Sequence, residues 1–140
     1  VSMIQSVDSE KLAKEISRLG EKRGKITDIL IEVNIGREEN KSGVLPENLP
    51  ELLQKVSALP ALRVRGLMAI PPAGAPSEKT MNYFLKMHQY FIDTGTKKID
   101  NVSMDYLSMG MSADYAQAIR AGANMVRIGT ALYGPRIYKK

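Results

Sequence analysis

Blocks of apolar residues alternate with amphipathic stretches along this chain and predict strands and helices in succession. The clearest strand is expected at 26–35, where Ile29, Leu30, Ile31 and Val33 are nearly continuous, as in a parallel strand buried on both faces. Shorter apolar runs predict four further strands, at 1–7, 64–70, 102–107 and 125–128. The segments between these predicted strands have the periodicity of amphipathic helices. The order βαβαβαβαβ indicates a parallel sheet with helical crossovers.

Two of the expected helices show their apolar stripes clearly. The first follows Asp8 or Ser9 as the N-cap, carries Leu12, Ile16 and Leu19 on one face, and ends near glycine. The second is long, begins near 77 and ends at 95. Its stripe consists of Met81, Phe84, Leu85, His88, Phe91 and Ile92.

The segments richest in polar chemistry all follow predicted strands, at 34–43, 71–76, 108–112 and 129–130. In barrels and open parallel sheets, ligands bind at the carboxyl ends of the strands. The last of these segments resembles the phosphate-binding end of a (β/α)₈ barrel. A complete barrel of this kind takes about 250 residues, more than this chain has. We therefore expect residues 1–140 to form one incomplete α/β barrel domain, the C-terminal five strands of a (β/α)₈ TIM barrel.

The stretch 107–134 contains the strongest candidate for a binding site. Ser108 and Gly110 are expected to open a loop, with Ser112 as N-cap of a short helix. The next strand ends at Gly129 and Thr130, where another helical turn begins. Free N–H groups at helix N-termini bind anions, and the anion expected here is phosphate.

Composition narrows the classes of function. The chain has no cysteine, so disulfides, thiolate nucleophiles and cysteine-based zinc sites are excluded, and a cytoplasmic setting is favoured. No apolar run is long enough to cross a membrane. The net charge is +5, but the basic residues are dispersed and aromatic residues are few, so nucleic-acid binding is not favoured. Because the first residue is a valine inside a strand-like run, we expect the beginning of the protein to be missing.

Five segments make the chain resemble the pyridoxal-phosphate homeostasis proteins, the YggS/PROSC family, whose fold is like the barrel of alanine racemase. They are QSVDS (5–9), VNIGREENKSG (33–43), RGLMAIPP (65–72), LSMGMSADYAQAI (107–119) and VRIGTALYGPRIY (126–138). The resemblance implies an alanine-racemase-like fold and a pyridoxal 5′-phosphate cofactor. Family members hold this cofactor through a Schiff-base lysine on the first barrel strand, which would lie upstream of Val1 and is absent here.

With this resemblance, Ser108, Gly129 and Thr130 are expected to bind the cofactor phosphate, with further hydrogen bonds from Gly110 and Ser112. Hydroxyl and backbone N–H donors suit a dianion, and glycine allows close approach. The alternative is structural: Thr130 and Ser112 would only cap helices, and Ser108 would only begin a turn.

Four other residues are weaker candidates for the cofactor site. By analogy with the racemase-like site, Arg127 would donate a hydrogen bond to the pyridine nitrogen, which must then stay unprotonated because arginine only donates. A structural salt bridge is the alternative for Arg127. Asn34 and Lys41 follow the second strand, where Lys41 would reach the phenolate side of the cofactor or remain solvated. Met68 would pack near the ring or simply fill the core.

The favoured hypothesis is a pyridoxal-phosphate-binding protein of vitamin B6 and amino-acid homeostasis, which holds or delivers the cofactor without turnover. The alternatives are a pyridoxal-phosphate-dependent amino-acid racemase and a basic RNA-binding module. A racemase needs a second acid or base, for which Tyr106 is the nearest candidate. Because the absent strands leave open edges, we also expect the isolated piece to be unstable or to self-associate.

Overall fold

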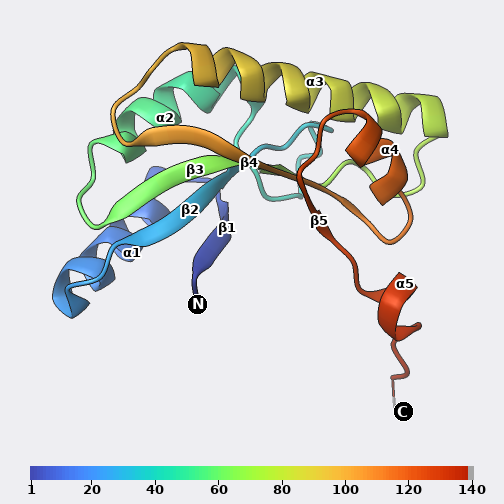
Figure 1. Cartoon of the computed structure of the whole chain (residues 1–140), viewed down its shortest axis with the longest axis horizontal. Coiled ribbons are helices and arrows are strands. Elements are labelled where there is room, and N and C mark those ends of the chain that lie inside the picture. Colours follow the sequence, from blue (N-terminus) through green and yellow to red (C-terminus); the bar gives the residue numbers. More distant parts are fainter. Residues whose placement is uncertain (139–140) are drawn as a thin grey trace.

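The computed structural model describes residues 1–138 and places strands and helices in the predicted succession (Figure 1). A helix follows each strand, so the alternation expected from the apolar pattern is confirmed. The elements are β1 (Met3–Val7), α1 (Glu10–Arg23), β2 (Thr27–Glu32), a 3-10 turn η1 (Pro46–Asn48), α2 (Leu49–Ser57), β3 (Leu62–Ala69), α3 (Ser77–Thr96), β4 (Val102–Met111), α4 (Tyr115–Arg120), β5 (Met125–Arg127) and α5 (Thr130–Tyr133).

The strands form one parallel sheet of five strands in the order β1-β2-β3-β4-β5. Strands that are consecutive in sequence are neighbours in the sheet, because the segment between them returns the chain to the next position. In Figure 1, α2 and α3 lie along one side of the sheet, while α5 projects beyond the end of β5. The architecture is the predicted half-barrel with its helices on the outside.

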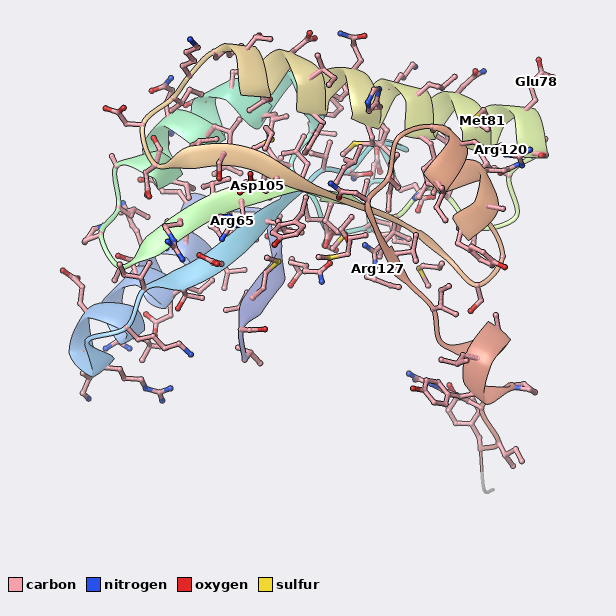
Figure 2. The ribbon with its side chains drawn as sticks, viewed as in Figure 1. Arg65, Glu78, Met81, Asp105, Arg120 and Arg127 are labelled. Carbon is pink, nitrogen blue, oxygen red and sulfur yellow. The ribbon has the colours of Figure 1, made fainter. Side chains whose placement is uncertain are left out.

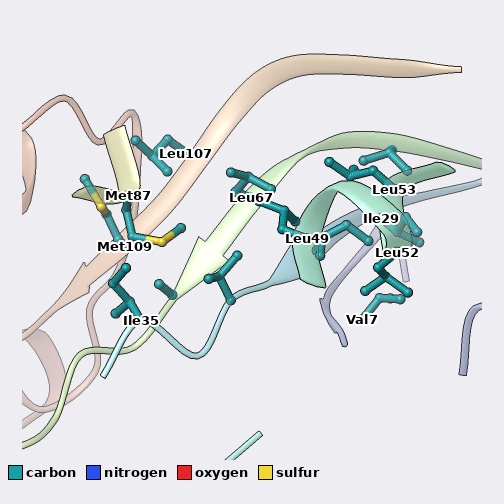
Figure 3. Close-up of a cluster of buried hydrophobic side chains, with 14 of the residues drawn as sticks. Val7, Ile29, Ile35, Leu49, Leu52, Leu53, Leu67, Met87, Leu107 and Met109 are labelled. Atoms are coloured by element: carbon teal, nitrogen blue, oxygen red, sulfur yellow. The ribbon is translucent and has the colours of Figure 1, made fainter. Parts of the chain in front are cut away.

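The hydrophobic core lies between the sheet and the helices α1 to α4 (Figure 3). Alternate strand residues point into it, so Ile29 and Ile31 on β2 and Leu67 on β3 are fully buried there. Leu30 is also fully buried but is not part of this cluster, because it points to the other side of the sheet. This other side, called the concave face below, corresponds to a barrel interior and carries the candidate site.

Helix α1 has the predicted ends but buries a different face. The Ser9 hydroxyl oxygen accepts a hydrogen bond from the Leu12 backbone N–H (3.2 Å), and Gly24 ends the helix with a φ of 63°. Leu12 and Leu19, which the sequence places on one face with Ile16, are each 37% exposed, whereas Ile16 is buried. Small residues on the adjacent face let the helix approach the sheet closely. The buried positions are Ala13, Ile16, Ser17 and Gly20.

Helix α3 confirms part of its predicted stripe. Phe84 is fully buried, whereas Leu85 and Ile92 are about half exposed and lie at the edge of the stripe. The ring of His88 packs closely on Gly122, where a side chain would overlap it. His88 is thus a packing residue at the contact between α3 and the end of α4.

A charged network joins the amino-terminal halves of three strands on the sheet. The Arg65 side chain donates to Asp105 (2.7 Å) and to Asp28 (2.9 Å), and Figure 2 shows Arg65 and Asp105 close together. The Arg65 guanidinium also lies 5.3 Å from the ring centre of Tyr106. Hydrogen bonds from Arg65, and then from Ser103, lower the pKa of Asp105 below its ordinary value. The ionised form of Asp105 therefore stabilises the folded state.

This network predicts acid sensitivity. A carboxyl with a lowered folded pKa contributes stability above its unfolded pKa and loses it as the pH falls through the folded pKa. Replacing Arg65 by methionine should therefore flatten the decline of unfolding free energy with falling pH, measured by urea denaturation at several pH values. Arg63→Met is the control, because Arg63 pairs with Asp28 and not with Asp105. If the unfolding free energy falls equally with pH in Arg65→Met and in the unmodified chain, the Arg65–Asp105 contact is not the cause of the acid sensitivity.

Candidate functional site

Ser108 and Gly110 lie inside β4, so the prediction that they open a loop is wrong. The strand continues to Met111 instead of ending at Leu107. Ser108 is fully buried and is in register with Met68 on β3 and with Met125 on β5. A buried hydroxyl needs hydrogen-bond partners, and Ser108 finds them on the concave face.

Three hydrogen bonds connect Ser108 and Arg127 with other strands. The Arg127 guanidinium donates through Nη1 to Ser108 Oγ (2.5 Å) and through Nη2 to the carbonyl oxygen of Ala69 (3.1 Å). Ser108 Oγ in turn donates to Gln5 Oε1 (2.7 Å). Figure 2 shows Arg127 on the side of the sheet away from α3, which is the concave face. The Arg127 side chain therefore points into the interior of the half-barrel.

The positive charge of Arg127 has no ion-pair partner among residues 1–138, and the nearest opposing charges act from a distance. Burial lowers the pKa of the Arg127 guanidinium, and the more distant negative charges of Glu32 and Asp114 oppose this shift. Within residues 1–138, no carboxylate lies within 4.0 Å of Arg127, so the structural salt bridge considered from the sequence is not formed there. A half-buried cation with neutral partners is suited to bind an acceptor on a ligand.

Ser112 caps a different helix from the one predicted. Helix α4 begins at Tyr115 with Asp114 as its N-cap, and the Asp114 carboxylate accepts from the Met111 N–H (2.8 Å). The Ser112 hydroxyl oxygen instead accepts from the backbone N–H groups of Gly129 (3.2 Å) and Ala131 (3.0 Å). These contacts bring Ser112 to the start of α5. The sequence analysis had placed Ser112 at the start of one helix and Gly129 and Thr130 at the start of another.

A hollow of about 670 Å³ opens beside these residues, at the carboxyl ends of β4 and β5. Its lining includes Ser112, Arg127, Gly129, Thr130, Tyr133 and Arg136. A side chain added at Gly129 would meet nothing within 4 Å, so the backbone there is open to a ligand. Gly110 does not line this hollow; its φ of 99° and the overlap of an added Cβ with Ala118 account for the glycine, and its cofactor role stays a prediction. Four predicted residues therefore share one hollow.

Asn34 and Lys41 line a second hollow of about 310 Å³, after β2. The Asn34 side chain donates to the Glu38 carbonyl (2.8 Å) and accepts from the Glu38 N–H (3.1 Å), so it holds the loop in place. Lys41 is exposed. Met68 is buried on β3, in register with Ser108. The cofactor roles of Asn34, Lys41 and Met68 stay predictions.

Two residues of the concave face were missed by the sequence analysis. Gln5 on β1 accepts from Ser108, and Glu32 at the end of β2 is only 5% exposed, with the Ser42 hydroxyl donating to it (2.7 Å). A polar side chain that follows Ile29–Ile31 was a usable signal for Glu32. The contact between Gln5 and Ser108 joins residues 103 positions apart and has no local signal.

The described part of the chain has neither a cluster of metal ligands nor a helix suited to a membrane. No group of three or more potential metal ligands comes together among residues 1–138. No helix within those residues combines the length and apolar character needed to span a membrane.

Comparison with known proteins places these residues in a family. Residues 2–137 match the family described as alanine racemase, N-terminal domain. The pyridoxal phosphate homeostasis protein of Aquifex aeolicus is 45% identical over 138 residues, which cover 99% of this chain and 60% of the relative. The chain thus spans about three-fifths of the length of that relative.

Solved structures agree with this match. PipY of Synechococcus elongatus, solved with pyridoxal phosphate bound, is 30% identical with a TM-score of 0.84, covering 95% of this chain and 61% of PipY. Alanine racemase of Clostridium difficile, at 18% identity and a TM-score of 0.72 over 96% of this chain and 36% of the racemase, shares the fold. The chain belongs to the alanine racemase N-terminal domain family and is similar to pyridoxal phosphate homeostasis proteins.

Proposed function

We propose that this chain binds pyridoxal 5′-phosphate on its concave face, and that the whole protein holds or delivers this cofactor in vitamin B6 and amino-acid homeostasis. The observation that carries the proposal is the similarity to PipY, which was solved with the cofactor bound and matches nearly the whole of this chain. The names of the curated relatives support the same function.

The chemistry of the donor set fits the phosphate of this cofactor. Two backbone N–H groups, of Gly129 and Ala131, converge on Ser112 Oγ, whose own proton stays available for a third group. Thr130 supplies a further hydroxyl at the same hollow, and the backbone at Gly129 is sterically open. Hydroxyl donors beside an open backbone are suited to a phosphate dianion.

Other residues of the concave face would contact the rest of the cofactor. When bound, pyridoxal phosphate supplies an electrophilic aldehyde and an electron-withdrawing ring. Arg127 would donate to the ring nitrogen and keep it unprotonated, because a guanidinium has no acceptor to offer. Met68 would pack against the ring, while Asn34 and Lys41 would border its other end. An unprotonated ring withdraws electrons weakly, which suits either limited racemase-like chemistry or simple holding of the cofactor.

The experiment is an equilibrium titration of the chain with pyridoxal phosphate, pyridoxal and inorganic phosphate. We expect one saturable site for pyridoxal phosphate and weaker binding of pyridoxal, because pyridoxal lacks the group that the Ser112 hollow binds. Borohydride reduction and intact mass should show no covalently labelled lysine. Absence of saturable binding, or equal affinity for pyridoxal, would contradict the proposal, and stoichiometric labelling would direct attention to Lys41.

We also propose that the isolated chain self-associates. Within residues 1–138, β1 pairs only with β2 and β5 only with β4, so each has an unpaired edge. Open edges promote pairing with another chain. Sedimentation velocity over a range of concentrations should show dimers or larger species. A monodisperse monomer with a cooperative thermal transition would contradict this expectation.

A further inference from the structure

Gln5 reaches across the concave face from the opposite edge of the sheet. It lies on β1, whereas its partner Ser108 lies on β4, with β2 and β3 between these strands in the sheet. Gln5 Oε1 and Ser108 Oγ are 2.7 Å apart. The Gln5 side chain is therefore held over the interior of the half-barrel.

The direction of the hydrogen bonds among Arg127, Ser108 and Gln5 follows from which groups can donate and which can accept. A guanidinium can only donate, so Ser108 Oγ must accept from Arg127 Nη1 (2.5 Å). Ser108 has a single proton, which is thereby left for Gln5 Oε1. The order of donation is Arg127 to Ser108 to Gln5, and an acceptor at Gln5 is what keeps the Ser108 lone pair facing Arg127.

Arg127 is oriented from two sides. One contact is the Ser108 hydroxyl supported by Gln5, and the other is the Ala69 carbonyl on β3. A guanidinium has five N–H donors, and within residues 1–138 Arg127 donates to no acceptor other than these two. Its other donors are thus available to a ligand in one fixed orientation.

We propose that Gln5 is a positioning residue for ligand binding, which acts through Ser108 to hold the Arg127 guanidinium toward the acceptor atom of the bound ring. The inference rests on the proposed function for the identity of the ring. Gln5 is neutral, so it orients Arg127 without neutralising it, and the positive charge is kept for the ligand. Through these contacts, a residue on the first strand, β1, fixes the orientation of a binding residue on the last strand, β5.

The first test uses the unliganded chain and needs no cofactor. Hydrogen exchange of the Arg127 guanidinium, followed by NMR, should be slow in the unmodified chain and at least about fivefold faster in Gln5→Leu, as expected for loss of one hydrogen bond. Gln5→Glu keeps an acceptor oxygen and should restore slow exchange. Ser6→Ala, an exposed position on the same strand, is the matched control.

Two outcomes would overturn the inference: unchanged exchange in Gln5→Leu, or equal acceleration in Ser6→Ala. If Gln5→Leu fails to fold, Ser108→Ala decides in its place, because loss of the hydroxyl must also release Arg127.

The second test compares ligands. Gln5→Leu should weaken pyridoxal phosphate binding about fivefold and leave the affinity for inorganic phosphate unchanged, since phosphate does not use Arg127 in this scheme. Equal weakening of both ligands would overturn the inference. If the unmodified chain binds no pyridoxal phosphate, the proposed function fails, while the exchange experiment still decides the role of Gln5.

Discussion

Replacing Gly66 by alanine is expected to prevent the chain from folding, or to cost at least about 3 kcal/mol of unfolding free energy. Gly66 lies in β3 at the centre of the sheet, paired with Leu30 on β2 and Tyr106 on β4. Its φ is 155°, and an added Cβ would overlap the Tyr106 carbonyl oxygen and lie 2.7 Å from the carbonyl carbon. Because both atoms belong to a strand backbone, neither can rotate away. Urea denaturation followed by circular dichroism measures the loss.

Gly24→Ala is the matched control for this prediction. Gly24 has a φ of 63°, but a side chain there meets nothing within 4 Å, so only the backbone conformation is penalised. The expected cost is about 1 kcal/mol. Similar costs at the two positions would mean that β3 and β4 do not approach as closely at Gly66 as the register indicates.

Replacing Arg127 by methionine is expected to separate binding from stability. Methionine has a similar length and carries no charge, so the variant removes a half-buried cation whose hydrogen-bond partners are neutral. The denaturation midpoint should stay the same or rise. Affinity for pyridoxal phosphate should fall about tenfold or more, the usual loss when a charged hydrogen-bond donor is removed. Denaturation and the cofactor titration measure the two effects.

Arg63→Met provides the control for Arg127→Met. Arg63 lies on β3, is mostly exposed, and pairs with Asp28 at the other end of the sheet. Its loss should leave cofactor affinity unchanged. An unfolded Arg127→Met variant would identify Arg127 as a structural residue, and unaltered affinity would remove it from the binding site.

The architecture was predictable because it depends on patterns within each segment. The continuous apolar run around Ile29–Ile31 indicated a buried parallel strand, and the strict alternation with helices indicated the order of the sheet. The ends of β4 were less predictable. Ser and Gly at 108–110 favour a loop locally, but Ser108 is satisfied by Gln5 and Arg127, which are distant in sequence. Tertiary hydrogen bonds therefore extended the strand beyond its local signal.

The candidate site was predictable in part for the same reason. Polar residues after parallel strands gather at one end of the sheet, which brings Ser112, Gly129 and Thr130 to one hollow as expected. Which helix Ser112 caps depends on how β4 and β5 are placed side by side, so its sequence position suggested the wrong one. Gln5 has no local signal, because its contact with Ser108 forms only when the sheet is assembled, whereas the position of Glu32 directly after Ile29–Ile31 was a usable signal.

The most direct test of the central claim is an NMR map of the backbone amides that change when pyridoxal phosphate is added. We expect the largest shifts at Gly129, Thr130 and Ala131, with smaller ones near Ser112, and saturation at one molecule per chain. Shifts confined to exposed lysines away from the ends of β4 and β5 would contradict the proposed cofactor site.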